Sequence, residues 1–133
     1  MFEYYLAGFF DGEGSVMIRF KKDKRYKSGY QIEPKINITQ KDKRVLELIQ
    51  KKLGFGKLYY HRRDDLWHYN VQKAKDMKTF ISLIHDKVIV KKSQIKKFEF
   101  CLNEFILKKH LSDKGFRRIM DYWSAPETEA NSR

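Results

Sequence analysis

The chain has 133 residues and a formal net charge of +12, and its hydrophobic content of 41% with 15% aromatic residues excludes a disordered chain. No apolar run approaches the roughly 20 residues that cross a bilayer, and no basic leader precedes the first apolar segment. A single cysteine, Cys101, excludes an internal disulfide framework and a cysteine-based zinc finger. We therefore expect one intracellular domain over residues 1–124, with no membrane contact, and a disordered tail over residues 125–133.

The positive charge is concentrated in the middle of the chain. Residues 51–100 contain 13 Lys and Arg against 5 Asp and Glu. Nucleic acid is the favoured partner, because neutralised phosphates release condensed counterions. The alternative, that the charge only keeps the protein dispersed, stays open at this point.

Hydrophobic periodicity predicts helices and strands in a regular order. In chain order they are a helix over 3–12, strands over 14–22 and 30–40, a helix over 42–53, hairpin strands over 56–62 and 66–72, and helices over 75–86, 93–109 and 112–123. Pro34 predicts a sheet edge or a bulge, and Asp42 and Gly54 are suitable helix caps. The α+β pattern repeats a helix-strand-strand unit, and one sheet face is rich in basic, amide and imidazole groups, as suits a DNA groove.

The most informative segment is LAGFFDGEG, residues 6–14. Gly8 and Gly12 are four apart and share one helix face, where small residues let a second helix approach closely. Asp11 and Glu13 stand at the end of that helix, where the macrodipole disfavours negative charge. A divalent cation reverses that balance, and the Glu13 carboxylate with the Gly12 carbonyl offers oxygen ligands that suit Mg²⁺.

This segment resembles the LAGLIDADG motif of homing endonucleases, and the resemblance extends over about residues 4–107. The element order also resembles the family's αββαββα half-domain, in which an antiparallel sheet binds DNA. The chain has one copy of the motif, which in this family implies a homodimer. The motif helices then pack at the dimer interface through Leu6, Gly8, Phe9 and Gly12.

The resemblance also implies roles for individual residues. Glu13 is the catalytic acid and binds Mg²⁺, which Mn²⁺ can replace, together with the Gly12 carbonyl. Asp11 is the structural acid of the motif. Gln40 takes the family's polar position near the scissile phosphate, and Lys91 takes the basic one. For both residues the alternative is an ordinary solvated surface position.

The implied activity is intron homing, by a double-strand cut with short 3′ overhangs in a long pseudo-palindromic site. The strand alternation predicts the groups that contact the DNA bases. They are Arg19, Lys21, Gln31, Lys35, Asn37, Lys57, Tyr59, His61, His68, Asn70 and Gln72. Further basic side chains are expected to contact phosphates or peripheral positions of the DNA. They are Lys24, Arg25, Lys27, Arg44 and Lys92.

Three other functions stay open from the sequence. The first is an RNA-binding maturase that acts on intron RNA, and the second is a non-catalytic DNA-binding regulator of the same fold. The third and weakest is a basic structural protein of a ribonucleoprotein. The four histidines lack the close spacing of a zinc site, and the role of Tyr122 and Trp123 is undecided.

Overall fold

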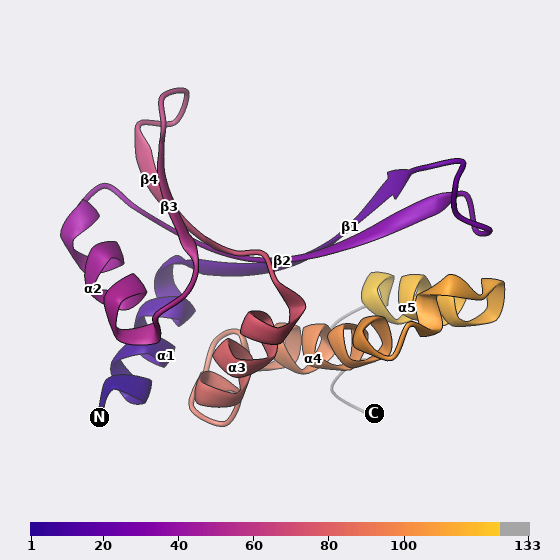
Figure 1. Ribbon diagram of the computed structural model, residues 1–133. Helices are drawn as coiled ribbons and strands as arrows, with labels where there is room; N and C mark the ends of the chain where they lie inside the picture. Colours follow the sequence, from indigo (N-terminus) through magenta and orange to yellow (C-terminus); the bar gives the residue numbers. More distant parts are fainter. Residues whose placement is uncertain (126–133) are drawn as a thin grey trace.

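The structure, a computed structural model, describes residues 1–125 and has the predicted order of elements (Figure 1). They are α1 (Phe2–Glu13), β1 (Gly14–Lys22), β2 (Tyr30–Gln40), α2 (Lys43–Leu53), β3 (Lys57–His61), β4 (Leu66–Val71), α3 (Ala74–Ile84), α4 (Lys92–Ile106), the 3₁₀ turn η1 (Lys109–Leu111) and α5 (Asp113–Ser124). The α+β prediction is confirmed. The predicted tail, apart from Ala125, lies outside the described residues.

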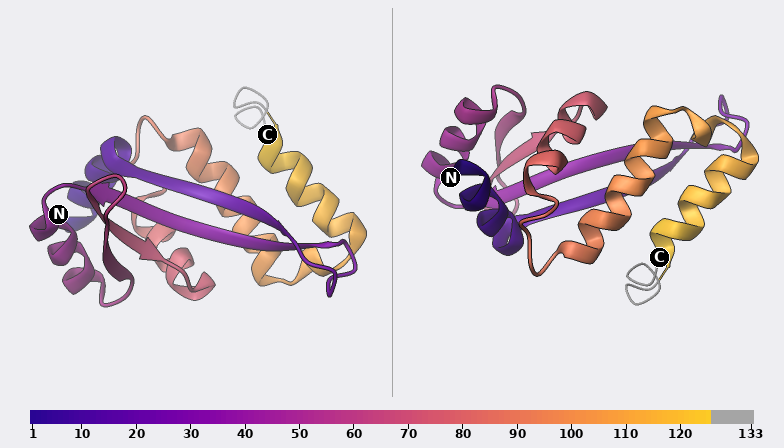
Figure 2. Two further views of the ribbon diagram at one scale, coloured as in Figure 1. Left: turned by 90° about the horizontal axis from the view of Figure 1, so that it is seen from above. Right: turned by 90° about the horizontal axis from the view of Figure 1, so that it is seen from below.

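The four strands form one antiparallel sheet in the order β1-β2-β4-β3. The sheet is curved like a saddle, and the β1–β2 and β3–β4 hairpins rise at its two ends (Figure 1). All the helices lie on one side of it, as the views from above and below show (Figure 2). The concave face is therefore left uncovered by any described element.

Strand β2 is the longest strand, and only part of it is paired on both sides. It pairs with β1 along its length but with β4 only over 36–40. Pro34 lies in the half that has no β4 partner, opposite Ile18 of β1 in an uninterrupted register. The edge predicted from Pro34 is thus present, because proline lacks the N–H that a second neighbour would require.

The core fills the space between the sheet and the helices. Its largest side chains, among them Phe10, Tyr69, Phe80 and Phe98, are wholly buried. The rings of Phe10 and Phe80 meet edge to face at 5.6 Å between centroids, which joins α1 to α3. Each such side chain contributes roughly 1.5–3 kcal/mol by burial, so the core holds the motif helix firmly against the sheet.

Close packing also decides how α1 passes into β1. A Cβ on Gly14 would lie 2.1 Å from Cδ2 of Phe10, far inside van der Waals contact. Only glycine therefore lets β1 begin directly where α1 ends. This turn brings the end of the motif helix to the rim of the sheet.

Two features differ from the sequence expectations or resolve them. Helix α4 ends at Ile106 rather than at 109, because Lys108 takes a left-handed conformation with φ of 60°. The Tyr122 ring is tilted against the Phe100 ring at 4.5 Å between centroids, and the Trp123 ring meets the Phe98 ring edge to face at 6.3 Å, so both aromatic residues pack α5 on α4. No helix within residues 1–125 combines the length and hydropathy that a membrane crossing requires.

Candidate active site and nucleic-acid interface

The end of the motif helix is tied to the segment before α4. The Asp11 carboxylate accepts the amide of Ile89 at 2.7 Å and that of Lys91 at 3.0 Å. Lys91 Nζ in turn donates to the Asp11 carbonyl at 2.6 Å. A cation at this carbonyl also complements the negative end of the helix dipole. Asp11 and Lys91 therefore fasten two segments that lie far apart in the chain.

Glu13 has the opposite character. Its side chain is exposed, and no hydrogen bond or ion pair joins its carboxylate to another residue in the described part of the chain. The Phe10 carbonyl accepts the Gly14 amide, and the Asp11 carbonyl accepts Lys91 Nζ. The Gly12 carbonyl follows these two at the helix end, where carbonyls have no partner within the helix.

These two oxygen donors fit a hard divalent cation. Both belong to the class of ligand that Mg²⁺ takes, and both residues are exposed at the end of α1. A carboxylate and a carbonyl leave most coordination positions to water or to a phosphate, as is usual for protein-bound Mg²⁺.

Gln40 lies close to this helix end by strand register. Gly14 pairs with Ile38, so Gln40 is two residues beyond the pair at which β1 begins. Its Oε1 accepts the amide of Lys41 at 2.8 Å, and its side chain is half-buried. Lys92 begins α4 as an exposed residue, whereas Lys91 contacts the motif helix directly.

The strand register places the predicted DNA-contacting groups of the strands on one face. Across β1 and β2, Lys21 lies opposite Gln31, Met17 opposite Lys35 and Ser15 opposite Asn37. The same face continues over β4 and β3 through these cross-strand sets: Asn37, Asn70 and Lys57; Thr39, His68 and Tyr59. Because the alternate residues Ile36, Ile38 and Tyr69 are wholly buried toward the helices, this face is the one that no helix covers. Gln72 lies just beyond the end of β4.

Two of the predicted positions need correction. Asn70 is on the predicted face but is only 2% exposed, because Asn37 and Lys57 flank it on the neighbouring strands, so it presents almost no surface to a base. Leu6 is 0% exposed within the core of its own chain, so it has no surface to offer a dimer partner. Periodicity alone could not separate Leu6 from the exposed side of the same short helix.

The two arginines expected near phosphates each bind a neighbouring carboxylate. Arg25 contacts Asp23 and Arg44 contacts Asp42, both at 2.7 Å. Hydrogen bonds from each guanidinium lower the pKa of the paired carboxyl to about 2. Both arginine side chains remain largely exposed and accessible to phosphate.

Exposed apolar residues gather beside α1. Tyr4 and Tyr5 lie on the helix, while Ile89 and Val90, 82% and 77% exposed, lie in the segment that Asp11 holds. Lys87 Nζ lies 5.4 Å from the Tyr4 ring, which joins the two parts of this patch. Sequence reasoning missed Ile89 and Val90, and their apolar character within KVIVKK was the available signal.

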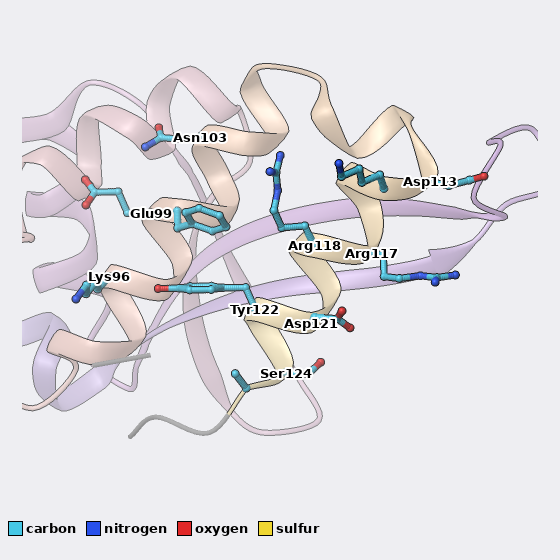
Figure 3. A pocket seen from close by; sticks show the side chains of 12 residues that line it. Lys96, Glu99, Asn103, Asp113, Arg117, Arg118, Asp121, Tyr122 and Ser124 are labelled. Carbon is cyan, nitrogen blue, oxygen red and sulfur yellow. The ribbon is translucent and has the colours of Figure 1, made fainter. Parts of the chain in front are cut away.

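A groove of about 1310 Å³ lies between α4 and α5 (Figure 3). It is lined by mixed charges that include Glu99, Arg118 and Asp121, on the helical side of the molecule. No residue expected to bind metal or DNA lines it, so it is not the candidate active site.

A further cluster lies at the β3–β4 hairpin. The histidine spacing predicted no shared site, but the hairpin brings the His61 and His68 rings to 5.4 Å, with Asp64 between them. The sequence reasoning considered the histidines alone and missed the aspartate of the turn.

Comparisons with known proteins agree on one family. The model described as LAGLIDADG endonuclease matches residues 6–103. DNA endonuclease I-CreI from Chlamydomonas reinhardtii is 30% identical over 95 residues, which is 70% of this chain and 57% of that protein's length.

Solved structures show the same arrangement. An archaeal intron-encoded homing endonuclease, I-Vdi141I in complex with DNA, matches with a TM-score of 0.86 and 25% identity over 98% of this chain and 92% of its own. Meganuclease I-SmaMI bound to DNA matches at 0.85 and 26% identity over 91% of this chain but only 42% of its own.

Proposed function

Since the chain belongs to the LAGLIDADG endonuclease family, we propose that it is a site-specific, metal-dependent double-strand DNA endonuclease that acts as a homodimer. The observation that carries the proposal is the unpaired Glu13 at the helix end, beside an uncovered sheet face with basic and amide groups.

The two glycines of the motif helix support the homodimer. A Cβ on Gly8 or Gly12 would meet nothing within 4 Å, so packing within the chain does not require either glycine. A second motif helix crossing at these positions would require both, because small residues permit close backbone approach. The exposed Tyr4, Tyr5 and Ile89 then add apolar area around the crossing. A two-fold axis here brings the two Glu13 carboxylates near each other.

The proposed chemistry is phosphodiester hydrolysis at both strands. A bound divalent cation supplies charge neutralisation and an activated water for in-line attack. Glu13 and the Gly12 carbonyl hold the cation, and the Asp11–Lys91 contacts keep that helix end in place. Gln40 orders water near the phosphate, and the Lys91 ammonium adds positive charge nearby.

The concave face is proposed to read the DNA. The dimer carries +24, twice the +12 of one chain, and its two-fold axis matches a pseudo-palindromic site. Basic side chains suit guanine and phosphate, and amides such as Gln31 suit adenine. We propose short 3′ overhangs and intron homing as the cellular use. Binding of such a charged face is expected to weaken steeply with salt.

Cleavage of a randomised DNA-site library tests the proposal. Wild type is compared with Glu13→Gln, with Glu47→Gln as a control that removes an exposed carboxylate on α2. Each protein is assayed with Mg²⁺ and with Ca²⁺. We expect wild type and Glu47→Gln to cut one pseudo-palindrome in Mg²⁺ only, and Glu13→Gln to bind that site without cutting.

Other outcomes decide against the proposal in different ways. Selection of a site without cleavage in any metal would make the protein a DNA-binding regulator. Failure to select or cut DNA at all would make RNA the substrate to test, and a splicing assay on candidate intron RNA would then identify a maturase.

A further inference from the structure

Three side chains of the types that commonly ligate metals meet at the tip of the β3–β4 hairpin, apart from the motif helix. His61 is the last residue of β3, Asp64 lies in the turn and His68 is on β4. Asp64 Oδ1 is 3.1 Å from His61 Nδ1, and its Oδ2 is 3.1 Å from His68 Nε2. One ligand atom from each residue lies within 4.8 Å of the others.

The hairpin itself holds these groups together. Tyr59 pairs with His68 across the strands and His61 pairs with Leu66, so both imidazoles project from the same face at neighbouring positions. The Tyr59 ring stacks on His68 with centroids 5.1 Å apart, which limits how that imidazole can rotate. The Asp64 carboxylate is oriented by the Leu66 amide, which donates to Oδ1 at 3.1 Å.

The electrostatic state of Asp64 suits a metal ligand. Burial raises the pKa of this carboxyl, but hydrogen bonds from His68 and His61 outweigh that effect and leave the pKa lowered. The carboxylate is therefore charged at neutral pH. With the two imidazole rings it forms a mixed nitrogen and oxygen donor set, which differs from the oxygen donors at Glu13.

We propose that His61, Asp64 and His68 form a binding site for one first-row transition-metal ion of the zinc class. Zn²⁺ takes histidine nitrogen and aspartate oxygen at about 2.0–2.2 Å, and a tetrahedral ion at those lengths spaces its ligands by roughly 3.3 Å. The two histidine–aspartate separations of 3.1 Å, one to each oxygen of the carboxylate, are close to that spacing. Three protein ligands leave one coordination position open to solvent.

Metal binding requires that the coordinating nitrogen of each imidazole ring carry no proton. In the hydrogen-bonded state His61 Nδ1 and His68 Nε2 each donate to Asp64. A coordinating nitrogen has no proton, so an ion bound at His61 Nδ1 and His68 Nε2 displaces the proton from each of these atoms. The ion then links β3, the turn and β4 at their tip.

The site lies on the uncovered sheet face, so a bound dication would add positive charge on the side proposed for DNA. That consequence rests on the proposed function, but the metal site itself does not. The test therefore uses free protein without DNA or Mg²⁺, so that failure of one proposal is distinguishable from failure of the other.

The experiment is a Zn²⁺ titration of the chelator-stripped full chain, prepared without a histidine tag, by competition with a chromogenic chelator. We expect one Zn²⁺ per chain for wild type. His68→Gln should weaken binding at least tenfold, since loss of even an outer-shell partner commonly costs roughly 10- to 100-fold. The matched control is His85→Gln, an exposed histidine that lies 3.8 Å from Glu99 outside the cluster. His85→Gln should bind Zn²⁺ as wild type does.

A second readout covers the case in which His68→Gln folds poorly. Zn²⁺ should shift the imidazole NMR resonances of His61 and His68 in the wild-type chain and leave those of His85 and His110 in place. Equal Zn²⁺ affinity of wild type and His68→Gln, or shifts spread evenly over all four histidines, would overturn the proposal.

Discussion

Asp11 and Lys91 bind each other twice, although 80 residues separate them in the sequence. The Lys91 amide donates to the Asp11 carboxylate, and the Lys91 ammonium donates to the Asp11 carbonyl. The first bond holds the segment before α4 against the motif helix. The second places a positive charge at the end of that helix, one residue before Gly12 and two before Glu13.

Replacing Asp11 by alanine should destabilise the fold. It leaves the amides of Ile89 and Lys91 without a charged acceptor, a loss of about 1–3 kcal/mol. Urea unfolding measures this loss, and Asp86→Ala is the control, because that exposed carboxylate pairs only with the adjacent Lys87 among the described contacts. Equal unfolding midpoints for the two variants would show that the Asp11 contacts do not stabilise the chain.

The neighbouring lysines should differ in their effect on cleavage. Lys91→Met removes the ammonium at the motif helix, while Lys92→Met removes an exposed one at the start of α4. We expect a drop on the order of 100-fold in the single-turnover rate for Lys91→Met, since small displacements of reacting groups cost about that much. Lys92→Met should change DNA affinity at most. A larger rate loss in Lys92→Met would reverse the assignment of the two positions.

Gly8→Ala should separate folding from dimerisation. The added Cβ meets nothing within the chain, and alanine favours a helix over glycine by about 1 kcal/mol, so the monomer should be as stable or more stable. The same methyl group should obstruct the proposed helix crossing. Sedimentation velocity should show dimers for wild type and monomers for Gly8→Ala at equal concentration. Dimers of unchanged affinity in the variant would place the interface elsewhere.

Substitution of Tyr69 or of Gly56, which lie in contact, should destabilise the fold to different extents. The buried Tyr69 hydroxyl donates to the Phe55 carbonyl at 2.7 Å, and a Cβ on Gly56 would lie 2.4 Å from the Tyr69 ring. Tyr69→Phe should cost about 1 kcal/mol by loss of one hydrogen bond. Gly56→Ala should cost more, because it adds this clash to a φ of 99° that alanine disfavours. Thermal unfolding compares the stability losses of the two variants. Gly29→Ala is the control for the backbone effect alone, because Gly29 also has a positive φ but a Cβ there would meet nothing within 4 Å.

Stability at low pH should report on Asp42. Hydrogen bonds from Arg44 lower the pKa of this carboxyl from 3.8 to about 2. Because the folded pKa lies below the unfolded one, the ion pair stabilises the fold above about pH 4 and is lost as the pH falls through about 2. The melting temperature of wild type should exceed that of Asp42→Asn near neutral pH, and the difference should narrow below about pH 4 and disappear as the pH falls below about 2. High salt should also shrink the difference, since the pair is exposed. A difference that persists under acid would mean that capping geometry, not charge, distinguishes the variants.

The local elements could be predicted because their causes are local. Val16, Ile18 and Phe20 alternate within one strand, and Asp42 and Gly54 cap α2 by contacts with their own neighbours. The end of α4 could not be predicted in this way. The apolar sequence continues through Ile106 and Leu107, and the helix stops at the left-handed turn of Lys108.

The residues of the candidate site also fall into those that the sequence could predict and those that it could not. The motif predicted Gly8, Gly12 and Glu13 as site residues. The shared face of the two glycines could be predicted because a helix places residues four apart on one face whatever surrounds it. The burial of Leu6 and Asn70 could not be seen there, since it depends on which neighbouring strands and helices cover them. The exposed Ile89 and Val90 were missed for the same reason.

The order of elements, the polar face of each strand and the acid at the end of the motif helix could all be predicted from the residues alone, because they depend on the backbone period and on a few adjacent residues. The contacts of Asp11 with Ile89 and Lys91, and the cluster of His61, Asp64 and His68 at the hairpin, became visible only in the folded chain. Such contacts depend on how strands pair and helices pack, and that arrangement is set by burial of the whole core rather than by any one segment.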